Sequence, residues 1–336
     1  MRRPSEERPT DHLPSLLARL DRAEVVVVGD LVADEYVYGE TERISREAPV
    51  LIVRYESSEL KAGGAGNAAM NVAALGVKVK LVGVVGDDPL GTALLDELEG
   101  GGVDVAGVVR VKGRPTEAKT RILAGGRSTR RQQMIRLDRA PPPLPAAAEA
   151  KVVKTIERLS RGAGAVLASD YGSGALGAAS VEALRRVKGR GVPVCVDSRY
   201  NLRGFGGLTM VKPNEVELET ASGVKLDGPG GLEKAARALL RKVACEVLLV
   251  TRGRNGMTVF RPGQPPAHIP PHGHAEAVDV TGAGDTVAAT FTAGLAAGAD
   301  PVTAARLANV AGALVVLKPG TATITREEIA DALLRP

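Results

Sequence analysis

The segment Glu24-Val25-Val26-Val27-Val28-Gly29-Asp30 indicates the fold class of this 336-residue chain. Its unbroken run of valines predicts a strand that is buried on both faces, as the strands of a parallel sheet are. Similar runs recur, and helical stretches such as residues 67–76, 181–191 and 231–244 separate many of them. Strands that alternate with helices predict a doubly wound α/β fold, in which helices flank a mostly parallel sheet. The other runs are KVKLVGVVG (78–86), GAVLASD (164–170), VPVCVD (192–197), LTMVKPN (208–214) and CEVLLVTRG (245–253).

Polar residues follow several of these predicted strands. In a doubly wound sheet, ligands bind beyond the carboxyl ends of the strands. We therefore expect a site where these residues gather. They are Asp30, Asp34, Asp170, Asp197, Asn214 and Thr251.

Two segments, about 35–60 and 108–138, look strand-like but have no helices between their strands. Their apolar and polar residues alternate, which is typical of a sheet with one face in solvent. We expect them to form a small β-sheet lid over one end of the main sheet. The remaining organisation is a polar lead-in over residues 1–23, with one short amphipathic helix, and a single domain over residues 24–336.

The composition argues against several classes of protein. The net charge is +5, the basic residues are scattered apart from a short run at Arg127, Arg130 and Arg131, and only 2% of residues are aromatic. Single-stranded nucleic acids need aromatic side chains to stack on, so no nucleic-acid partner is expected. No apolar stretch is long enough for a membrane span or follows the polar start as a signal would, so we expect a cytoplasmic protein with no membrane partner. Cys195 and Cys245 each lie in an apolar run and are predicted to be reduced core thiols.

The segment Asp279-Val280-Thr281-Gly282-Ala283-Gly284-Asp285 precedes an apolar helical stretch. Glycines directly before a helix let backbone N–H groups converge on an anion, and the helix dipole favours negative charge there. A carboxylate in the first turn, Asp285, would lie beside that anion. The arrangement suits transfer of a phosphoryl group to a hydroxyl, because the amides stabilise the phosphate charge and the carboxylate takes the proton.

The glycine-rich segments allow other interpretations. The segment at 279–285 could be an ordinary turn with an aspartate at a helix start. The chain contains no Gly-Lys dipeptide, which excludes a Walker A loop. The segment Gly64-Ala65-Gly66-Asn67-Ala68-Ala69 fits the loose dinucleotide pattern GxGxxA, but it follows the charged stretch ELKA instead of a buried strand, which argues against a Rossmann dehydrogenase.

Two segments together resemble the signatures of the PfkB carbohydrate kinase family. The first is Ala62-Gly63-Gly64-Ala65-Gly66-Asn67-Ala68-Ala69 with Gly76 after the helix, and the second is DVTGAGD at 279–285. The resemblance covers about residues 24–330. It implies a ribokinase-like fold and an ATP-dependent sugar kinase that uses Mg²⁺ and K⁺.

Within that family the chain looks most like the D-glycero-β-D-manno-heptose 7-phosphate kinases, which make the 1,7-bisphosphate for the heptose of lipopolysaccharide. The supporting segments are VVGDLVADEYVYG (27–39), RISREAPV (43–50), GGAGNAAMNVAALG (63–76), RQQMIRLD (131–138) and SDYGSGAL (169–176). The strings RIS-x-EAPV and QQ-x-IRLD, characteristic of that subgroup, lie in the expected lid, and such loops usually determine substrate choice.

The resemblance also implies roles for individual residues. Asp285 would deprotonate the attacking O1 hydroxyl, and Gly282, Ala283 and Gly284 would supply the amides around the transferring phosphate. Asn214 and Glu217, which match an NxxE pattern, would hold Mg²⁺ through water, and Asp279 would help to hold a monovalent cation. The residues implied for the sugar phosphate are Asp34, Gly63, Gly64, Asn67, Arg136, Asp170 and Arg199. Those implied for ATP are Lys212, Asn214, Thr251, Gly253 and Asn309.

Several alternatives stay open at this point. Asn214 could simply cap the following helix, Asp34 could be a turn residue, and Asn309 could be a polar residue of an amphipathic helix. Ser173 stands where many relatives of the subgroup carry Lys, which removes a cation, whereas Arg43, Arg46, Lys119 and Arg121 remain as further cations. The alternatives for function are a kinase of a fructose- or ribose-type sugar and a non-catalytic sugar- or nucleotide-binding regulator. We expect no fused nucleotidyltransferase domain, and we expect a homodimer through the lid because its strand edges are exposed.

Overall fold

The valines of the first strand divide the core into two halves. In β1 (Glu24–Gly29), Val25 and Val27 pack into one hydrophobic cluster, whereas Val26 and Val28 pack into another, and all four are fully buried. Successive side chains of a strand point to opposite faces of its sheet. The two clusters are therefore the two faces of the central sheet, as the run of valines predicts.

The structure is a computed structural model that describes residues 12–126, 131–273 and 276–334. The first eleven residues of the predicted lead-in, and Arg127 and Arg130 of the basic run, lie outside the described residues. In the described part, eight strands form the main sheet in the order β14-β13-β12-β11-β10-β9-β1-β4. Within this order, the neighbouring strands β12, β11, β10, β9, β1 and β4 pair in parallel. Strands β13 and β14 extend the sheet beyond β12 with antiparallel pairing. Their bounds are β4 (Lys78–Val82), β9 (Ala165–Asp170), β10 (Val194–Ser198), β11 (Met210–Val211), β12 (Val247–Thr251), β13 (Met257–Phe260) and β14 (Ala267–Ile269).

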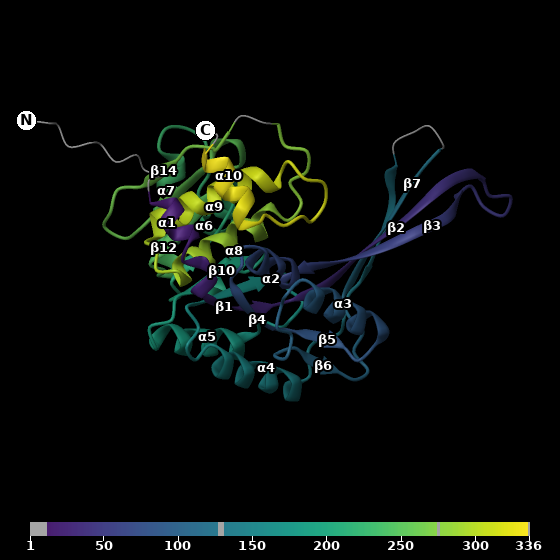
Figure 1. Ribbon diagram of the computed structural model, residues 1–336, viewed down its shortest axis with the longest axis horizontal. Coiled ribbons are helices and arrows are strands. Elements are labelled where there is room, and N and C mark those ends of the chain that lie inside the picture. Colours follow the sequence, from purple (N-terminus) through teal and green to yellow (C-terminus); the bar gives the residue numbers. More distant parts are fainter. Residues whose placement is uncertain (1–11, 127–130, 274–275, 335–336) are drawn as a thin grey trace, which may run out of the picture.

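Helices cover both faces of this sheet, so the chain has the α/β fold that its pattern predicts (Figure 1). The first face packs against α1 (Leu13–Leu17), α2 (Ala65–Ala74), α3 (Pro89–Gly100), α8 (Ala283–Ala296), α9 (Pro301–Val315) and α10 (Arg326–Leu334). The second packs against α4 (Ala146–Leu159), α5 (Ala178–Gly189), α6 (Glu215–Ser222) and α7 (Gly231–Val243). Short 3₁₀ turns lie at η1 (Leu20–Arg22), η2 (Leu202–Phe205) and η3 (Gly253–Asn255).

The sequence pattern places the start of the domain at residue 24, but the hydrophobic core begins earlier in the chain. Leu13, Leu16 and Leu20 are fully buried, and Leu17 is nearly so, in the cluster on the first face of the sheet. The short amphipathic helix of the lead-in therefore contributes its apolar side to the domain.

A second sheet forms the lid and extends away from the helices in Figure 1. Its strand order is β3-β2-β7-β8, with β2 and β7 parallel and the outer pairs antiparallel. The expected range 108–138 is too wide, because β6 (Val109–Val111) pairs with β5 (Val84–Gly86) and packs its valines against the second core cluster. The lid strands are β2 (Leu31–Ile44), β3 (Leu51–Gly64), β7 (Ala118–Gly125) and β8 (Gln132–Arg139).

Two further observations concern the classes that composition argues against. Among the described residues, the helices are all too short or too polar to cross a membrane. Cys195 and Cys245 are buried free thiols, as predicted.

Candidate active site

Asp285 lies in the first turn of α8, directly after a glycine turn. Gly282 precedes the helix with a φ of 76°, in the left-handed region that favours glycine. A Cβ at Gly282 would lie 2.8 Å from Nδ2 of Asn67, and one at Gly284 would lie 3.5 Å from Nζ of Lys212. The turn therefore packs closely against two polar side chains that the sequence assigns to the site, and it leaves the amides of a 14-residue helix at its open end.

The Asp285 carboxylate is held at both oxygens. Nδ2 of Asn67 donates to Oδ2 at 2.7 Å, and the hydroxyl of Tyr171 donates to Oδ1 at 2.9 Å. The residue is only 5% exposed. Burial raises the pKa of Asp285, whereas the hydrogen bonds from Asn67 and Tyr171, and the nearby Lys212 ammonium, partly lower it. A buried carboxylate with a raised pKa and fixed orientation is a good acceptor for a proton.

Helix α2 positions Asn67 through a short network of side chains. Nδ2 of Asn71 donates to Oδ1 of Asn67 at 3.2 Å, and Oγ1 of Thr286 donates to Oδ1 of Asn71 at 2.8 Å. The network fixes which end of the Asn67 amide faces Asp285, and it joins α2 to α8. Sequence reasoning did not select Asn71 or Thr286, although Asn71 lies within the quoted segment 63–76 and Thr286 directly follows the segment 279–285.

The two glycines before α2 bring the lid strands close to the site. A Cβ at Gly63 would lie 2.4 Å from Oδ2 of Asp34, so a larger residue there would displace the Asp34 carboxylate. Gly64 has a φ of 58°, and its own Cβ would lie 2.5 Å from the carbonyl oxygen of Asp30. Asp34 is 7% exposed, and its charge raises the pKa of Asp285. The sequence-predicted residues Asp34, Gly63 and Gly64 are therefore brought together with Asp285.

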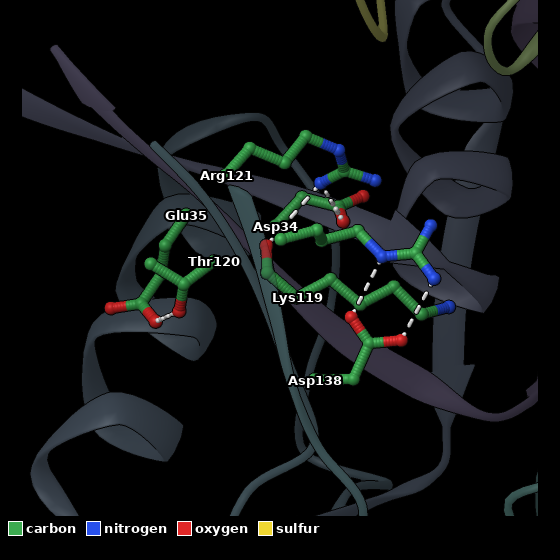
Figure 2. Close-up of polar contacts among 7 residues, drawn as sticks. Asp34, Glu35, Lys119, Thr120, Arg121 and Asp138 are labelled. Atoms are coloured by element: carbon green, nitrogen blue, oxygen red, sulfur yellow. Dashed lines mark hydrogen bonds and ion pairs between the residues drawn. The ribbon is translucent and has the colours of Figure 1, made fainter. Parts of the chain in front are cut away.

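The lid presents a row of cations on the face that carries Asp34 (Figure 2). Nη1 of Arg121 donates to Oδ1 of Asp34 at 2.6 Å, and the Lys119 ammonium lies 5.6 Å from the ring centre of Tyr171. Glu35 and Thr120, one residue along each strand, pair on the opposite side of the lid in Figure 2, as the alternation of strand side chains requires. Arg136 is half exposed and forms two hydrogen bonds with Asp138, at 2.8 and 3.0 Å.

Lys212 forms a buried ion pair beside the glycine turn. Its ammonium lies 3.0 Å from Oδ1 of Asp197, and the side chains are 4% and 16% exposed. Burial lowers the pKa of Lys212, but the charges of Asp197, Glu217 and Asp285 outweigh burial and raise it. Burial also raises the pKa of Asp197, although the ammonium of Lys212 lowers it in part. The lysine is therefore a fixed positive charge at the start of α8.

Asn214 and Glu217 form a capping box at the start of α6. Oδ1 of Asn214 accepts from the Glu217 amide at 2.8 Å, and Oε2 of Glu217 accepts from the Asn214 amide at 2.8 Å. The alternative that Asn214 caps a helix is thus correct as a description of its contacts. The second carboxylate oxygen of Glu217 lies outside the box. The negative charge of Glu217 interacts with both Lys212 and Asp197. One free carboxylate oxygen near this ion pair fits Mg²⁺, which takes few direct protein ligands and keeps several waters.

The other residues assigned to ATP and the cation lie in turns, loops or at a strand end, except Asn309, which lies within α9. The Thr251 amide donates to the Pro213 carbonyl at 3.0 Å, which places β12 beside the start of α6, and Gly253 follows in a turn with a φ of 50°. Nδ2 of Asn309 donates to the Pro270 carbonyl at 2.8 Å. Asp279 accepts from the amides of Thr281 and Gly320, both at 2.9 Å, and these bonds outweigh burial and lower its pKa.

Two residues assigned to the sugar occupy supporting positions. Asp170 accepts from Oγ of Ser198 at 2.6 Å and from the Gly172 amide at 3.1 Å, so its carboxylate holds the loop after β9. The Arg199 amide donates to the Asp170 carbonyl at 3.0 Å, and the Arg199 side chain is exposed. The structure does not place either charged group against Asp285.

The chief residue that sequence reasoning missed is Tyr171. It directly follows Asp170 at the end of β9, in the string SDYG that the resemblance quotes, so its position next to a site strand was the available signal. Asp197 was noted at a strand end but was not assigned to the site, because nothing in the sequence pairs it with Lys212.

Comparison with known proteins decides the family. The model of the pfkB family of carbohydrate kinases matches residues 22–328. The chain belongs to the pfkB family of carbohydrate kinases. The resemblance to this family in the sequence is therefore confirmed. So is the predicted activity class, a phosphotransferase acting on a sugar hydroxyl.

Curated relatives match nearly all of this chain. The bifunctional protein HldE of Pelobacter propionicus is 39% identical over 324 residues, which are 96% of this chain and 65% of that protein. The bifunctional protein HldE of Ectopseudomonas mendocina is 41% identical over 320 residues, which are 95% of this chain and 65% of that protein. The chain thus spans about 65% of the length of the curated relatives it matches.

Solved structures confirm the ribokinase-like fold of this pfkB family member. A ribokinase from Arabidopsis thaliana, complexed with ribose and ATP, has a TM-score of 0.70 and 23% identity, and the match covers 93% of this chain and 98% of that one. Phosphofructokinase-2 from Escherichia coli, complexed with potassium, has a TM-score of 0.76 and 18% identity at the same coverage of both chains.

Proposed function

We propose that this pfkB family kinase transfers the γ-phosphoryl group of ATP to the O1 hydroxyl of D-glycero-β-D-manno-heptose 7-phosphate. The observation that carries the proposal is the meeting of three groups at one end of the sheet. These are the buried Asp285 carboxylate, the Asp34 carboxylate at the root of the lid, and the lid cations beside it. The 39–41% identity to HldE proteins supports the same substrate class.

In this proposal Asp285 is the catalytic base. The O1 proton passes to its carboxylate, O1 forms a bond to the γ-phosphorus, and the bond from that phosphorus to the bridging oxygen of ADP breaks. The amides of Gly282, Ala283 and Gly284 and the ammonium of Lys212 stabilise the charge on the transferring group. Asn67 orients the carboxylate through its hydrogen bond at 2.7 Å.

The nucleotide and cation sites follow the same proposal. Lys212, Asn214, Thr251, Gly253 and Asn309 line the ATP side, and Asn214 with Glu217 would hold Mg²⁺ through water. A bound Mg²⁺ supplies neutralisation of phosphate charge. Asp279 would help to hold K⁺ beside the turn that it joins to Gly320.

Recognition of the 7-phosphate is assigned to cations of the lid and of the nearby loops. Lys119 and Arg136 lie on lid strands β7 and β8, and Arg199 follows β10. Cations that are exposed or half exposed can turn toward a phosphate without the cost of breaking a buried pair. The residues implied for the sugar hydroxyls are Asp34, Gly63, Gly64 and Asn67, with Asp170 holding the loop beneath.

Ser173, where many relatives carry Lys, bears on this assignment. Burial raises the pKa of Glu117, which the Ser173 side chain partly lowers, and Ser173 lines a small cavity with Asp30 and Arg114. The side chain thus faces the root of the lid and not Asp285. A serine at this position therefore leaves the cations named for the phosphate in place.

The quaternary structure in this proposal is a homodimer through the lid. The outer strands of the lid sheet, β3 and β8, carry exposed apolar side chains. A second copy of the chain would cover them. They include Leu51, Tyr55, Met134, Ile135 and Leu137.

The test is coupled ADP release from Mg²⁺-ATP with a panel of sugars. The panel contains D-glycero-D-manno-heptose 7-phosphate, unphosphorylated heptose, fructose 6-phosphate and ribose. Turnover confined to the heptose phosphate is expected. Equal turnover of the phosphorylated and unphosphorylated heptose would refute the phosphate assignment, and turnover on fructose 6-phosphate or ribose alone would replace the substrate while keeping the base.

A further inference from the structure

The loop after β9 is built around a buried carboxylate that the proposed reaction does not use. Asp30 is 2% exposed, and its two oxygens accept from the backbone amides of Tyr171, Ser173 and Ala175, at 2.9, 3.0 and 2.9 Å. Hydrogen bonds between a charged group and backbone amides are stronger than neutral ones. Asp30 therefore fixes the backbone from which the Tyr171 side chain extends.

Tyr171 places its hydroxyl on the Asp285 carboxylate from this fixed backbone. The distance from its oxygen to Oδ1 is 2.9 Å. Burial raises the pKa of Tyr171, and so does the charge of Asp285, so the hydroxyl keeps its proton and is the donor in this bond. The lid contacts the same side chain, because the Lys119 ammonium lies 5.6 Å from the centre of its ring.

We propose that Tyr171 is a positioning residue for the proton transfer. Its hydroxyl holds Asp285 ionised and oriented, so that the remaining lone pairs of the carboxylate face the acceptor hydroxyl. The inference rests on the proposed role of Asp285 as the base. Tyr171 itself takes no proton in this scheme and stays a hydrogen-bond donor throughout.

The groups around Asp285 determine the direction of the expected effect. Asn67 of α2 and Tyr171 donate hydrogen bonds that favour its charged form, and the ammonium of Lys212, after β11, favours that form as well. The charge of Asp34, from β2, opposes it, and Asp197 of β10 lies against Lys212. Loss of the Tyr171 hydroxyl removes a bond that only the ionised carboxylate accepts. The pKa of Asp285 is then expected to rise, by about one unit for a hydrogen bond to a charged group.

The test compares Tyr171→Phe with wild type in two measurements. In the first, the acidic limb of the pH profile of kcat/KM is expected to move up by about one pH unit, which lowers the rate on that limb about 10-fold, with the KM for ATP unchanged. In the second, carboxyl-carbon NMR of protein labelled with ¹³C-aspartate follows the titration of Asp285 without any substrate. The resonance is assigned by its loss in Asp285→Asn.

Tyr200→Phe is the matched control. Tyr200 packs near Gly172 of the same loop and is 76% exposed, so the variant removes a hydroxyl close by and leaves Asp285 bonded as before. Replacement of Tyr171 by a ring-fluorinated tyrosine is a second variant, which keeps the hydroxyl and makes it a stronger donor. It is expected to move the acidic limb down.

The outcomes separate the two proposals. An unchanged titration of Asp285 in Tyr171→Phe, or the same shift in Tyr200→Phe, would overturn the role of Tyr171. Normal turnover of Asp285→Asn would instead overturn the role of Asp285 as the base, whatever the titration shows.

Discussion

Arg121 and Asp34 form a largely buried ion pair between lid strands β7 and β2. Nη1 of the arginine lies 2.6 Å from Oδ1 of the aspartate, and the two side chains are 17% and 10% exposed. The pair joins a cation of β7 to the carboxylate implied for the sugar hydroxyls. The position of β7 in the lid therefore affects the orientation of the Asp34 carboxylate.

Arg121→Gln is expected to raise the KM for the sugar about 10-fold, because Asp34 then loses the cation that orients it. The kcat is expected to change little, since Arg121 does not contact Asp285. Steady-state kinetics with the sugar varied at saturating ATP measures both. Arg131→Gln is the control, because Arg131 pairs with Glu56 at 2.6 Å on an exposed part of the lid. An equal effect in the two variants would contradict a specific role for Arg121.

Asp285→Asn is expected to lower kcat by at least about 10²-fold, the low end for loss of a general base. ATP binding should persist, because the amides of the turn and Lys212 remain. Coupled ADP release gives kcat, and titration calorimetry gives the affinity for ATP. Asp331→Asn, at an exposed position of α10, is the control that also removes one carboxylate. A kcat within a few-fold of wild type would exclude Asp285 as the base.

Lys212→Met is expected to lower the free energy of unfolding by about 3 kcal/mol at neutral pH, because it leaves Asp197 buried without its partner. The pKa of Asp197, already raised by burial in the native protein, rises further in this variant. Its folded-state value then exceeds its unfolded value of about 3.9, so the stability of the variant is highest below about pH 4 and falls as the pH rises through the folded-state pKa. Urea denaturation at several pH values measures this.

The controls for Lys212 are a double variant and a surface pair. Lys212→Met combined with Asp197→Leu should recover most of the lost stability, since no buried charge remains. Lys188→Met, which breaks a pair with the 59% exposed Glu246, should cost little. A deficit of Lys212→Met that does not depend on pH would argue against the ion pair as its cause.

Glu217→Gln separates the capping box from Mg²⁺ binding. Gln also completes a capping box, so the melting temperature should change little. Loss of the carboxylate charge should raise the Mg²⁺ concentration needed for half-maximal turnover about 10-fold. Glu215→Gln, in the same turn of α6, is the matched control. An unchanged Mg²⁺ requirement would leave Glu217 with the cap alone.

Leu137→Glu is expected to convert a dimer to a monomer, because it places a charge in the exposed apolar part of β8. Leu137 is 64% exposed. Light scattering after gel filtration measures the mass in solution. Leu334→Glu, at an 80% exposed leucine of α10, should leave the dimer intact. A wild-type protein that is monomeric at micromolar concentration would refute the lid dimer.

Much of the architecture could be predicted from the sequence, because its signals are local. The valine run of β1 predicts burial on both faces, and glycine is favoured at positions 64 and 282 because the backbone there has a left-handed φ. The lid was found from alternation, but its edge at 108 was wrong because Val109 and Val111 alternate like lid residues and yet pack on the core.

The contacts that could not be predicted join residues far apart in the chain. Tyr171 and Asp285 are 114 residues apart, and nothing in the local pattern around either one selects the other. Likewise, the pairing of Lys212 with Asp197 depends on the parallel register of β10 and β11. Residue identity gave Asp285 and Lys212 as candidates, and only the packed sheet shows that Tyr171 and Asp197 are their partners.

The parallel pairing of β2 with β7 also bears on the order in which the chain folds. The residues of that pair, such as Asp34 and Arg121, are separated by 87 positions, and the intervening chain forms α2, β4 and α3. Closing so long a loop costs entropy that is recovered only when the intervening elements have already collapsed. We therefore expect β2 and β3 to emerge from the ribosome as a hairpin that remains unpaired until β7 and β8 have been synthesised. The hydrophobic edge of that hairpin would be the part of the nascent chain most exposed to chaperones.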